Sequence, residues 1–340
     1  MRFTRFSVIV AMSAIASSCA WTSTFATNKS NNCVVRTGSC KNKNSMALFG
    51  SKAAQKIASR SAWAENRGVG GDDDKSSDGD DGFGTIVGGG RIGGLLNSAG
   101  GESILLGRED SISSEKEGTP ILIATRNDSL ESIVDECPEN RKKDLVFLQN
   151  GYLDGFLEGK GLLDNTQVLL YLSVPAKGVE PVDGVTAVNP EGLTAATGVH
   201  AQAFADRLAT LGLKCNVITP EQYRPAMFEK LIWISTYMLV GTAKECKSVG
   251  DAGSQHKQLV EQVINELLAA VTAKEGVEFA SGAVERLAAY TDVVADFPCA
   301  VKEFEWRNQY FYNLGNEACP THNALLKECE DKGSITFSLP

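Results

Sequence analysis

The most informative part of the sequence is Phe83-Gly84-Thr85-Ile86-Val87-Gly88-Gly89-Gly90-Arg91-Ile92-Gly93-Gly94. Its apolar start is typical of a short buried strand, and Gly88, Gly90 and Gly93 follow with G-x-G-x-x-G spacing. In a dinucleotide-binding turn the first glycine permits a tight bend and the second lets the backbone approach a pyrophosphate. The third lets the next helix pack closely on the strand. Because further glycines surround the motif, a glycine-rich linker is the competing interpretation.

Short apolar runs, typical of strands, recur along the chain at residues 103–106, 120–125, 144–148, 167–172 and 214–219. Helical spacing appears between them, in Leu130, Ile133 and Val134 and in residues 201–211. This alternation predicts a parallel sheet covered by helices on both faces. The glycine motif then lies after a strand and at the start of a helix, where a phosphate group binds. We therefore expect a dinucleotide to contact Gly88, Gly90, Arg91, Ile92 and Gly93.

The residues after the second expected strand indicate which dinucleotide binds. An acidic residue there binds the ribose hydroxyls of NADH, whereas an arginine can clasp the 2′-phosphate of NADPH with a forked, charge-assisted hydrogen bond. Here the order is Arg108, Glu109, Asp110. Arg108 predicts NADPH, although the two acids leave NADH open. The alternative for Arg108 is an ordinary solvated loop charge.

The N-terminal part of the chain has the composition of a targeting segment. Residues 1–64 hold nine Lys and Arg and no Asp or Glu, so a chain of net charge −9 carries −18 in its remainder. An apolar run at residues 6–16 and small residues at 18–20 are typical of a signal peptide, and the basic Ser/Thr-rich sequence behind them of a transit segment. We predict a bipartite plastid leader over 1–64, with mitochondrial import or secretion as alternatives.

The remaining boundaries follow from composition and periodicity. Residues 65–82 are too acidic and too poor in apolar residues to pack, which predicts a disordered linker. We expect a Rossmann-like domain at 83–221 and a mostly α-helical domain at 222–340, so the fold class is α/β followed by α. Residues 228–241 are apolar but too few for a membrane span, so we expect no membrane contact of the mature protein.

Charge, cysteines and histidines argue against several classes of protein. The negative net charge argues against nucleic acid as the main partner. The cysteines outside the leader contain no C-x-x-C pair, and His200, His256 and His322 lie far apart in sequence. We therefore expect no metal site, and free thiols in a reducing compartment.

The ordered set of features resembles the ketopantoate reductases, NADPH-dependent enzymes of pantothenate synthesis. The resemblance covers roughly residues 83–330, and it is carried by the glycine motif, Arg108, the strand ending in Leu148-Gln149-Asn150-Gly151, the helix start Phe228-Glu229-Lys230-Leu231 and Glu303-Phe304-Glu305. It implies a Rossmann domain, a helical second domain and an active site in the cleft between them.

The resemblance also implies roles for individual residues. Asn150 would lie beside the nicotinamide and the substrate, Lys230 would be the catalytic lysine, and Arg126 would replace a lysine of the family near the cofactor. Glu305 would bind the substrate, with Glu303 as its rival. Negative charge develops on the oxygen of a ketone that accepts a hydride, and a lysine ammonium can stabilise it and donate the proton. As alternatives, Lys230 could extend to solvent, and Glu305 could be an ordinary surface carboxylate.

Two departures from the family weaken the expected substrate site. Ile234 and Met238 stand where the family has asparagines, one and two turns after the lysine. The chain between Arg108 and Pro120 is also too short for the usual helix and third strand. We therefore keep three functions open: an NADPH-dependent reductase of a small 2-keto acid, with ketopantoate as the default and a homodimer left open; a noncatalytic NADPH-binding sensor or partner protein; and an interaction module that keeps only the fold.

Overall fold

The computed structural model describes residues 84–101 and 103–340. The predictions for the leader and the linker, including the plastid address, fall on residues outside these ranges. Within the described ranges, seven strands form one sheet in the order β2-β1-β3-β4-β5-β8-β9. Their bounds are Thr85–Val87 (β1), Ile104–Leu106 (β2), Ile121–Ile123 (β3), Leu145–Phe147 (β4), Thr166–Leu169 (β5), Ala195–Thr197 (β8) and Asn216–Val217 (β9).

The first five strands of this order run parallel, and β8 then runs antiparallel to β5. The expected parallel sheet is therefore confirmed for its first part and mixed beyond it. The β8 strand escaped sequence analysis because an Ala-Ala-Thr segment lacks the bulky β-branched and aromatic residues that mark strands. The run expected at 167–172 divides into β5 and the start of a small hairpin of β6 (Leu172–Ser173) and β7 (Val182–Asp183).

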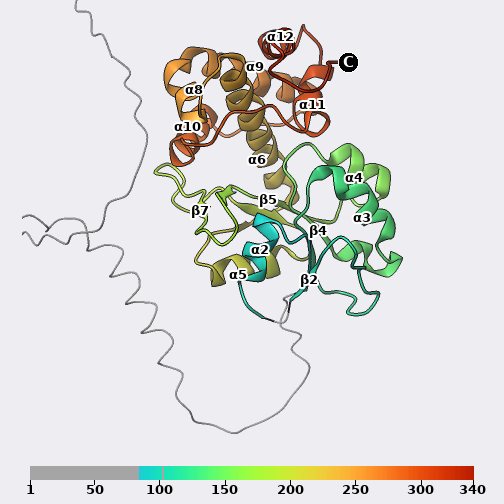
Figure 1. Cartoon of the computed structure of the whole chain (residues 1–340). Helices are drawn as coiled ribbons and strands as arrows, with labels where there is room; N and C mark the ends of the chain where they lie inside the picture. Colours follow the sequence, from blue (N-terminus) through green and yellow to red (C-terminus); the bar gives the residue numbers. More distant parts are fainter. Residues whose placement is uncertain (1–83, 102) are drawn as a thin grey trace, which may run out of the picture. The chain divides into compact units, whose positions relative to one another are not determined.

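Helices cover both faces of the sheet, as expected (Figure 1). Ile86 and Leu122 belong to the core under α2 (Arg91–Asn97) and α5 (Ala201–Thr210). Their neighbours in the strands, such as Ile121 and Ile123, pack on the opposite side. There the sheet is covered by α3 (Leu130–Glu136) and α4 (Asp154–Lys160). Side chains alternate between the faces of a strand, and both faces are apolar because both are buried.

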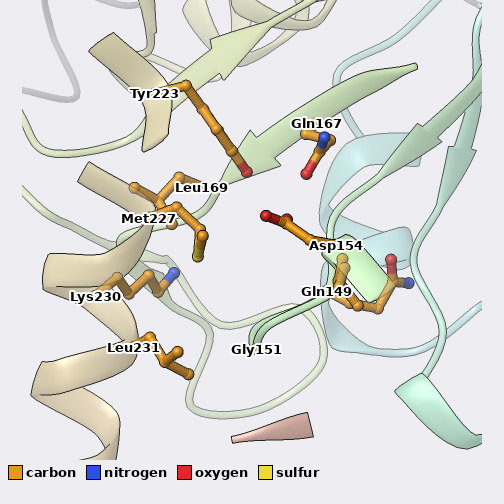
Figure 2. A pocket seen from close by; sticks show the side chains of 10 residues that line it. Gln149, Gly151, Asp154, Gln167, Leu169, Tyr223, Met227, Lys230 and Leu231 are labelled. Carbon is orange, nitrogen blue, oxygen red and sulfur yellow. The ribbon is translucent and has the colours of Figure 1, made fainter. Parts of the chain in front are cut away.

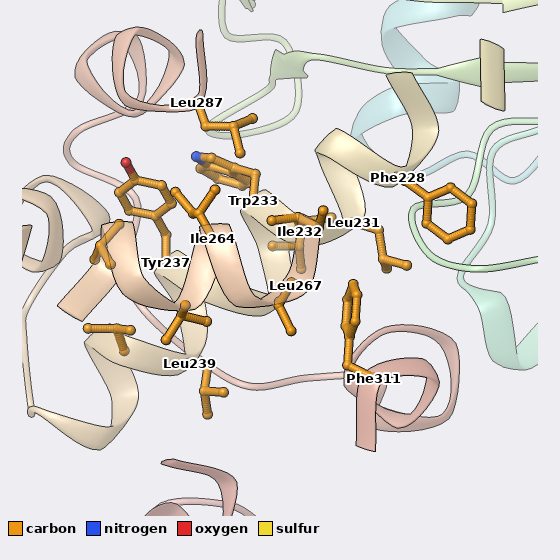
Figure 3. Packing of buried hydrophobic residues seen from close by; sticks show 14 of the residues in the cluster. Phe228, Leu231, Ile232, Trp233, Tyr237, Leu239, Ile264, Leu267, Leu287 and Phe311 are labelled. Carbon is orange, nitrogen blue, oxygen red and sulfur yellow. The ribbon is translucent and has the colours of Figure 1, made fainter. Parts of the chain in front are cut away.

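The C-terminal half is mostly helical and has its own apolar core (Figure 3). Its helices are α6 (Pro220–Trp233), a π-helical segment at Ile234–Met238, α7 (Leu239–Ala243), α8 (Val249–Gln255), α9 (Lys257–Glu275), α10 (Ala283–Val293), η4 (Phe304–Trp306), α11 (Asn308–Asn313) and α12 (Pro320–Asp331). The expected helix start near Phe228 is wrong. Thr219 and Gln222 form a capping box, so α6 begins at Pro220, and Lys230 lies in its last turn.

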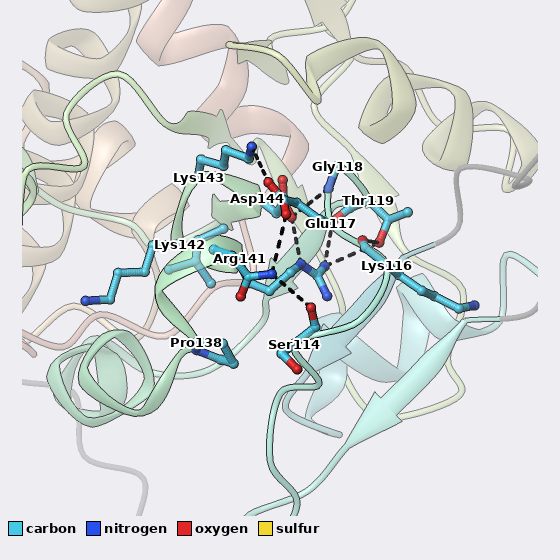
Figure 4. A network of polar contacts seen from close by, with 12 residues as sticks. Ser114, Lys116, Glu117, Gly118, Thr119, Pro138, Arg141, Lys142, Lys143 and Asp144 are labelled. Atoms are coloured by element: carbon cyan, nitrogen blue, oxygen red, sulfur yellow. Dashed lines mark hydrogen bonds and ion pairs between the residues drawn. The ribbon is translucent and has the colours of Figure 1, made fainter.

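The segment between β2 and β3 contains no helix or strand among the described residues, which agrees with its expected shortness. It is held instead by a buried polar network (Figure 4). Arg141 donates to Asp144 Oδ2 at 2.7 Å and to the main-chain oxygens of Ser113, Glu115 and Thr119. The side chains of Arg141 and Asp144 are 1% and 2% exposed. Two buried charges thus organise a loop where a strand would otherwise supply backbone hydrogen bonds.

In the part of the chain that the structure describes, no helix is both long enough and apolar enough to span a membrane. The same residues contain no group of three or more His, Cys, Asp or Glu side chains placed to hold a metal ion. The six cysteines among them are free thiols: Cys137, Cys215, Cys246, Cys299, Cys319 and Cys329.

Candidate active site

The sequence-predicted residues gather at one edge of the sheet because the carboxyl ends of parallel strands meet there. The glycine motif follows β1, Arg108 follows β2, Arg126 follows β3 and Asn150 follows β4. Helix α6 packs against β5 and β8 and brings Lys230 to the end of β5. This edge of the sheet therefore unites all the expected cofactor residues with the expected catalytic lysine.

The glycine turn has the backbone geometry that its spacing predicts. Gly88 has φ +101°, a conformation that strains any residue with a side chain. A Cβ on Gly93 would lie 1.8 Å from the Gly88 oxygen, so only glycine lets α2 approach the turn this closely. A Cβ on Gly90 would meet nothing within 4 Å, so the backbone there faces open space. Gly88 and Gly93 thus serve packing, and Gly90 leaves room for a ligand.

The two arginines beside the turn are solvated. Arg108 is exposed and has no hydrogen-bond or ion-pair partner among the described residues. The neighbouring Asp110 instead accepts a hydrogen bond from Gly107 N at 2.7 Å, which occupies one of its carboxylate oxygens. Arg126 is 76% exposed and pairs with Asp128 at 3.0 Å. Both guanidinium groups are free to turn toward a bound phosphate at little cost, because exposed ion pairs contribute little.

A lysine that sequence analysis missed also lies over the turn. Lys177 Nζ donates to Gly89 O at 3.3 Å. A second contact joins the same two segments, because Arg91 on α2 donates to Val174 O at 3.1 Å and to Pro175 O at 3.3 Å. The segment 174–177 is thereby held across the glycine turn. Nothing in the spacing of Lys177 relates it to residues 88–93, because the contact joins segments more than 80 residues apart.

The loop after β4 is fixed by polar contacts on one side and by η4 on the other. Gln149 Nε2 donates to Ile123 O at 2.9 Å, and Asn127 Nδ2 donates to Asn150 O at 2.9 Å. Tyr152 N donates to Trp306 O at 2.7 Å. These bonds hold Asn150 at the edge of the sheet and leave its side-chain amide without a protein partner among the described residues.

Gly151 supplies a direct test of this loop. It has φ +135°, and a Cβ there would lie 2.4 Å from Trp306 O. We expect Gly151→Ala to destabilise the protein by about 1–3 kcal/mol, because the backbone is strained and η4 must move. The matched control is Gly155→Ala in α4, where a Cβ meets nothing within 4 Å, and which should be neutral or stabilising by about 0.5–1 kcal/mol. Urea unfolding of both variants measures this, and equal stabilities would contradict the close contact.

Lys230 is buried, with 4% of its surface exposed. Its ammonium group donates to Leu170 O and lies 4.8 Å from the centre of the Tyr171 ring. Burial, and secondarily the charge of Arg307, lower the pKa of Lys230 well below its usual value of 10.5. The alternative in which Lys230 extends to solvent is therefore wrong. A buried amine with a depressed pKa releases its proton more readily than an exposed lysine does.

The pocket at Lys230 is small (Figure 2). Tyr223, Met227 and Lys230 project into it from α6, toward Gly151 and Asp154 on the other side. The enclosed space is about 10 Å³, room for about one water molecule. Its lining residues are Gln149, Gly151, Leu153, Asp154, Gln167, Leu169, Tyr223, Met227, Lys230 and Leu231. A substrate that reaches Lys230 must therefore move the walls of this pocket.

The two candidate glutamates differ in environment. Glu305 is exposed and forms no hydrogen bond or ion pair with other described residues, which favours the surface-carboxylate alternative. Glu303 has a left-handed backbone, with φ +51°, and pairs with Arg307. Arg307 is the charge that acts on Lys230. The rival Glu303 is thus the glutamate paired with Arg307, and no helical spacing indicates the pair, because the backbone of Glu303 is left-handed.

The structure also locates the two positions where the resemblance leads one to expect asparagine. Ile234 is buried and Met238 half-buried, at the two ends of the π-helical segment. The hydroxyls of Ser235 and Thr236, between them, are buried without a hydrogen-bond partner among the described residues. The helix after Lys230 is therefore apolar at positions 234 and 238, and its unpartnered polar groups are the two hydroxyls between them.

Comparisons with known proteins agree with this architecture. No protein-family model matches the chain, and no curated protein matches it. Solved structures do match it, and they show that the chain has a fold like that of the ketopantoate reductases. A ketopantoate reductase of the PanE/ApbA family from Ralstonia eutropha JMP134 superposes with a TM-score of 0.53 at 16% identity, over 74% of this chain and all of that one.

Of two further similar structures, one holds a cofactor with a ligand and the other is dimeric. D-mandelate dehydrogenase in a ternary complex with NADH and anilino(oxo)acetate matches with a TM-score of 0.51 at 16% identity, over 73% of this chain and 97% of that one. A dimeric ketopantoate reductase from Staphylococcus aureus matches with 0.51 at 16%, over 74% and 99%. At such identities the likeness confirms the expected fold, a Rossmann-like part followed by a helical part, and leaves the chemistry to the residues.

Proposed function

We propose that this protein is an NADPH-dependent reductase of a small 2-keto acid, with Lys230 as the proton donor. The observation that carries the proposal is the buried Lys230 at the carboxyl edge of the sheet, in one pocket with Gln149 and Gly151, the neighbours of Asn150. A lysine is almost never fully buried unless it is paired. Lys230 forms no ion pair with a described residue; its ammonium group donates to one carbonyl oxygen and lies over one aromatic ring, which is an environment suited to proton transfer.

The residues at the edge of the sheet fit a dinucleotide. The open space at Gly90 allows a pyrophosphate to approach the backbone, and Arg91 begins the helix behind it. Arg108 and Arg126 supply two solvated cations, and Asn150 presents an amide that no described residue uses. When bound, the reduced nicotinamide supplies the hydride.

The chain's own residues then complete the reduction. As the carbonyl carbon gains the hydride, the electron pair of its π bond moves onto the oxygen. Lys230 Nζ donates a proton to that oxygen, so the product is the 2-hydroxy acid and Lys230 is left neutral. Its lowered pKa suits this step, because a donor works best when its pKa lies near the working pH. Solvent returns the proton before the next turnover.

Arg108 should decide between the two nicotinamide cofactors. We expect Arg108→Ala to weaken NADPH binding by about 10- to 100-fold, because one charge-assisted, forked contact to the 2′-phosphate is lost. NADH binding should change less than about threefold. Cofactor fluorescence titration measures both. Arg126→Ala is the matched comparison at the next strand, and equal loss of NADPH and NADH affinity in Arg108→Ala would contradict the assignment.

One observation favours a second function, a noncatalytic NADPH-binding protein. Ile234 and Met238 are apolar where the resemblance leads one to expect asparagine, and the space at Lys230 holds little more than a water molecule. Under this alternative the protein binds NADPH and reduces no member of a panel of 2-keto acids. Reduction that depends on Lys230 would remove it.

Substrate and assembly are part of the proposal. Ketopantoate is the default substrate, but apolar residues at 234 and 238 favour keto acids whose chain is apolar beyond the carboxylate. A panel that ranges from ketopantoate to aryl and branched-chain keto acids separates these cases. By analogy with the dimeric Staphylococcus aureus protein, we propose a homodimer, which light scattering tests directly.

A further inference from the structure

Arg307 is a largely buried cation in the segment that contacts the loop after β4. It follows Trp306, whose main-chain oxygen accepts a hydrogen bond from Tyr152 N at 2.7 Å. Gly151, next to Tyr152, packs against the same oxygen and lines the pocket of Lys230. Arg307 and Lys230 therefore approach the Asn150-Gly151 loop from η4 and from α6, and the charge of Arg307 acts on Lys230.

The hydrogen bonding of Arg307 is incomplete. Its side chain is 16% exposed, and one terminal nitrogen pairs with Glu303 Oε2 at 2.5 Å. Its Nε is buried and has no hydrogen-bond partner among the described residues. A buried donor without a partner costs free energy, so it indicates a group that pairs with something else in the working protein. A guanidinium has five N–H donors in a fixed plane, and Glu303 uses only part of that fork.

Glu303 holds the arginine at a conformational cost. Its backbone is left-handed, with φ +51°, which is unusual for a residue other than glycine, asparagine or aspartate. This conformation places the Glu303 carboxylate back against Arg307. The left-handed residue and the ion pair are two separate features of one short segment, whose backbone contacts the loop after β4 at Trp306.

We propose that Arg307 binds the carboxylate of the 2-keto acid substrate, with Glu303 as the residue that positions it. The proposal deepens the reductase function and rests on it. A keto acid carries its carboxylate on the carbon next to the ketone, so a cation one residue beyond the loop contact can hold the acid while Lys230 reaches the ketone oxygen. This role assigns the recognition of the substrate to η4, and so explains why the apolar Ile234 and Met238 need not supply it.

Charge accounting agrees with this role. Arg307 is paired with Glu303, and the pocket residue Asp154 is paired with Arg224 at 2.7 Å, so each of these charges has a partner when Lys230 is neutral. A bound carboxylate adds a negative charge beside Arg307 and Lys230, which favours the protonated form of the amine. Substrate binding would then charge the proton donor when a proton is needed. A neutral carbonyl compound would neither pair with Arg307 nor favour the protonated form of Lys230.

The experiment compares the full-length protein with Arg307→Gln on three ligands. They are a 2-keto acid that the wild type reduces, the methyl ester of that acid, and oxamate, an unreactive keto acid analogue titrated into the NADPH complex by calorimetry. We expect Arg307→Gln to lower kcat/KM for the acid by about 100-fold, mostly through KM, as the loss of a buried ion pair does. The ester should change less than about threefold, and oxamate binding should be lost.

Two further variants separate this role from a structural one. Arg307→Lys keeps the charge without the fork and should restore part of the oxamate affinity. Arg286→Lys is the matched control, because Arg286 on α10 forms a similarly enclosed pair with Glu229 on α6, and it should leave the results with all three ligands unchanged. Thermal unfolding of each variant shows whether it folds.

The possible outcomes distinguish the role of Arg307 from the reductase function. Equal losses on acid and ester, or oxamate binding that survives Arg307→Gln, would overturn the role of Arg307 and leave the reductase intact. Oxamate binding that needs Arg307, in a wild type that reduces nothing, would support the carboxylate site and overturn the reductase. A wild type that binds NADPH but neither reduces keto acids nor binds oxamate would overturn both.

Discussion

Lys230→Met should lower kcat/KM for the reduced keto acid by about 10²- to 10⁴-fold, which is the range that a positioned general acid contributes. Methionine has nearly the length of lysine and fills the same space without an ammonium group. NADPH affinity should stay within about twofold, because no contact of Lys230 involves the glycine turn or Arg108. Stopped-flow reduction at saturating NADPH measures the chemical step, and fluorescence titration measures the cofactor.

The stability of Lys230→Met separates a catalytic role from a structural one. The folded-state pKa of Lys230 lies well below its unfolded value, so at neutral pH the unfolded chain binds the proton more tightly than the folded one. Burial of this amine therefore opposes folding below the unfolded pKa, and the opposition fades as pH rises toward that value. We expect Lys230→Met to unfold at the same or a higher urea concentration at pH 7. A variant that loses activity only because it unfolds would contradict this expectation.

The pH dependence of the wild type follows from the same shift. Reduction requires the protonated amine, so kcat should fall as pH rises through the lowered pKa of Lys230, well before the usual value of 10.5. For a keto acid, the pKa of Lys230 obtained from kcat, which reports the substrate complex, should exceed the pKa obtained from kcat/KM, which reports the free enzyme. The reason is that a bound carboxylate favours the charged amine. Initial rates at saturating and limiting substrate over one pH series give both.

Local chemistry was readable from the sequence, and contacts between distant segments were not. The turn at Gly88, Gly90 and Gly93 and the arginine after β2 depend on a few neighbouring residues, so spacing alone indicates them. The burial of Lys230 depends on Leu170 and Tyr171, 60 residues away, and no periodicity reports it. The different surroundings of Glu303 and Glu305 were not readable either, because the left-handed backbone at Glu303 and its pair with Arg307 leave no pattern in the sequence.

The segment after Arg108 is too short for a helix and a strand, which the sequence shows, and the structure shows that a buried arginine holds it instead. The absence of room for a helix and a strand was visible from the length between Arg108 and Pro120. The replacement is a buried guanidinium more than 20 residues later, which donates to three carbonyl oxygens of that segment. A single Arg in a charged run, Arg141-Lys142-Lys143-Asp144, looks like any solvated charge until its burial is known.

Arg141→Met should destabilise the protein by about 3–5 kcal/mol, the cost of leaving a buried charge without its partner. Asp144 would remain at 2% exposure with the Gly118 N–H as its nearest remaining donor, at 2.9 Å. The oxygens of the 113–119 loop would lose their donors as well. Lys143→Met is the matched control. Its ion pair with Glu117 at 2.7 Å is exposed, so its loss should cost less than about 1 kcal/mol.

The double variant Arg141→Met with Asp144→Asn tests the cause. Asparagine removes the orphaned charge but can still accept the hydrogen bond from Gly118 N, so the pair should recover about 1–3 kcal/mol of the loss. Urea midpoints of the wild type, the two single variants and the double variant give the coupling free energy between Arg141 and Asp144. Additive losses would mean that the guanidinium acts through the loop carbonyls rather than through Asp144. The network lies at the amino ends of β3 and β4, opposite the candidate active site, so NADPH affinity of the folded variants should not change.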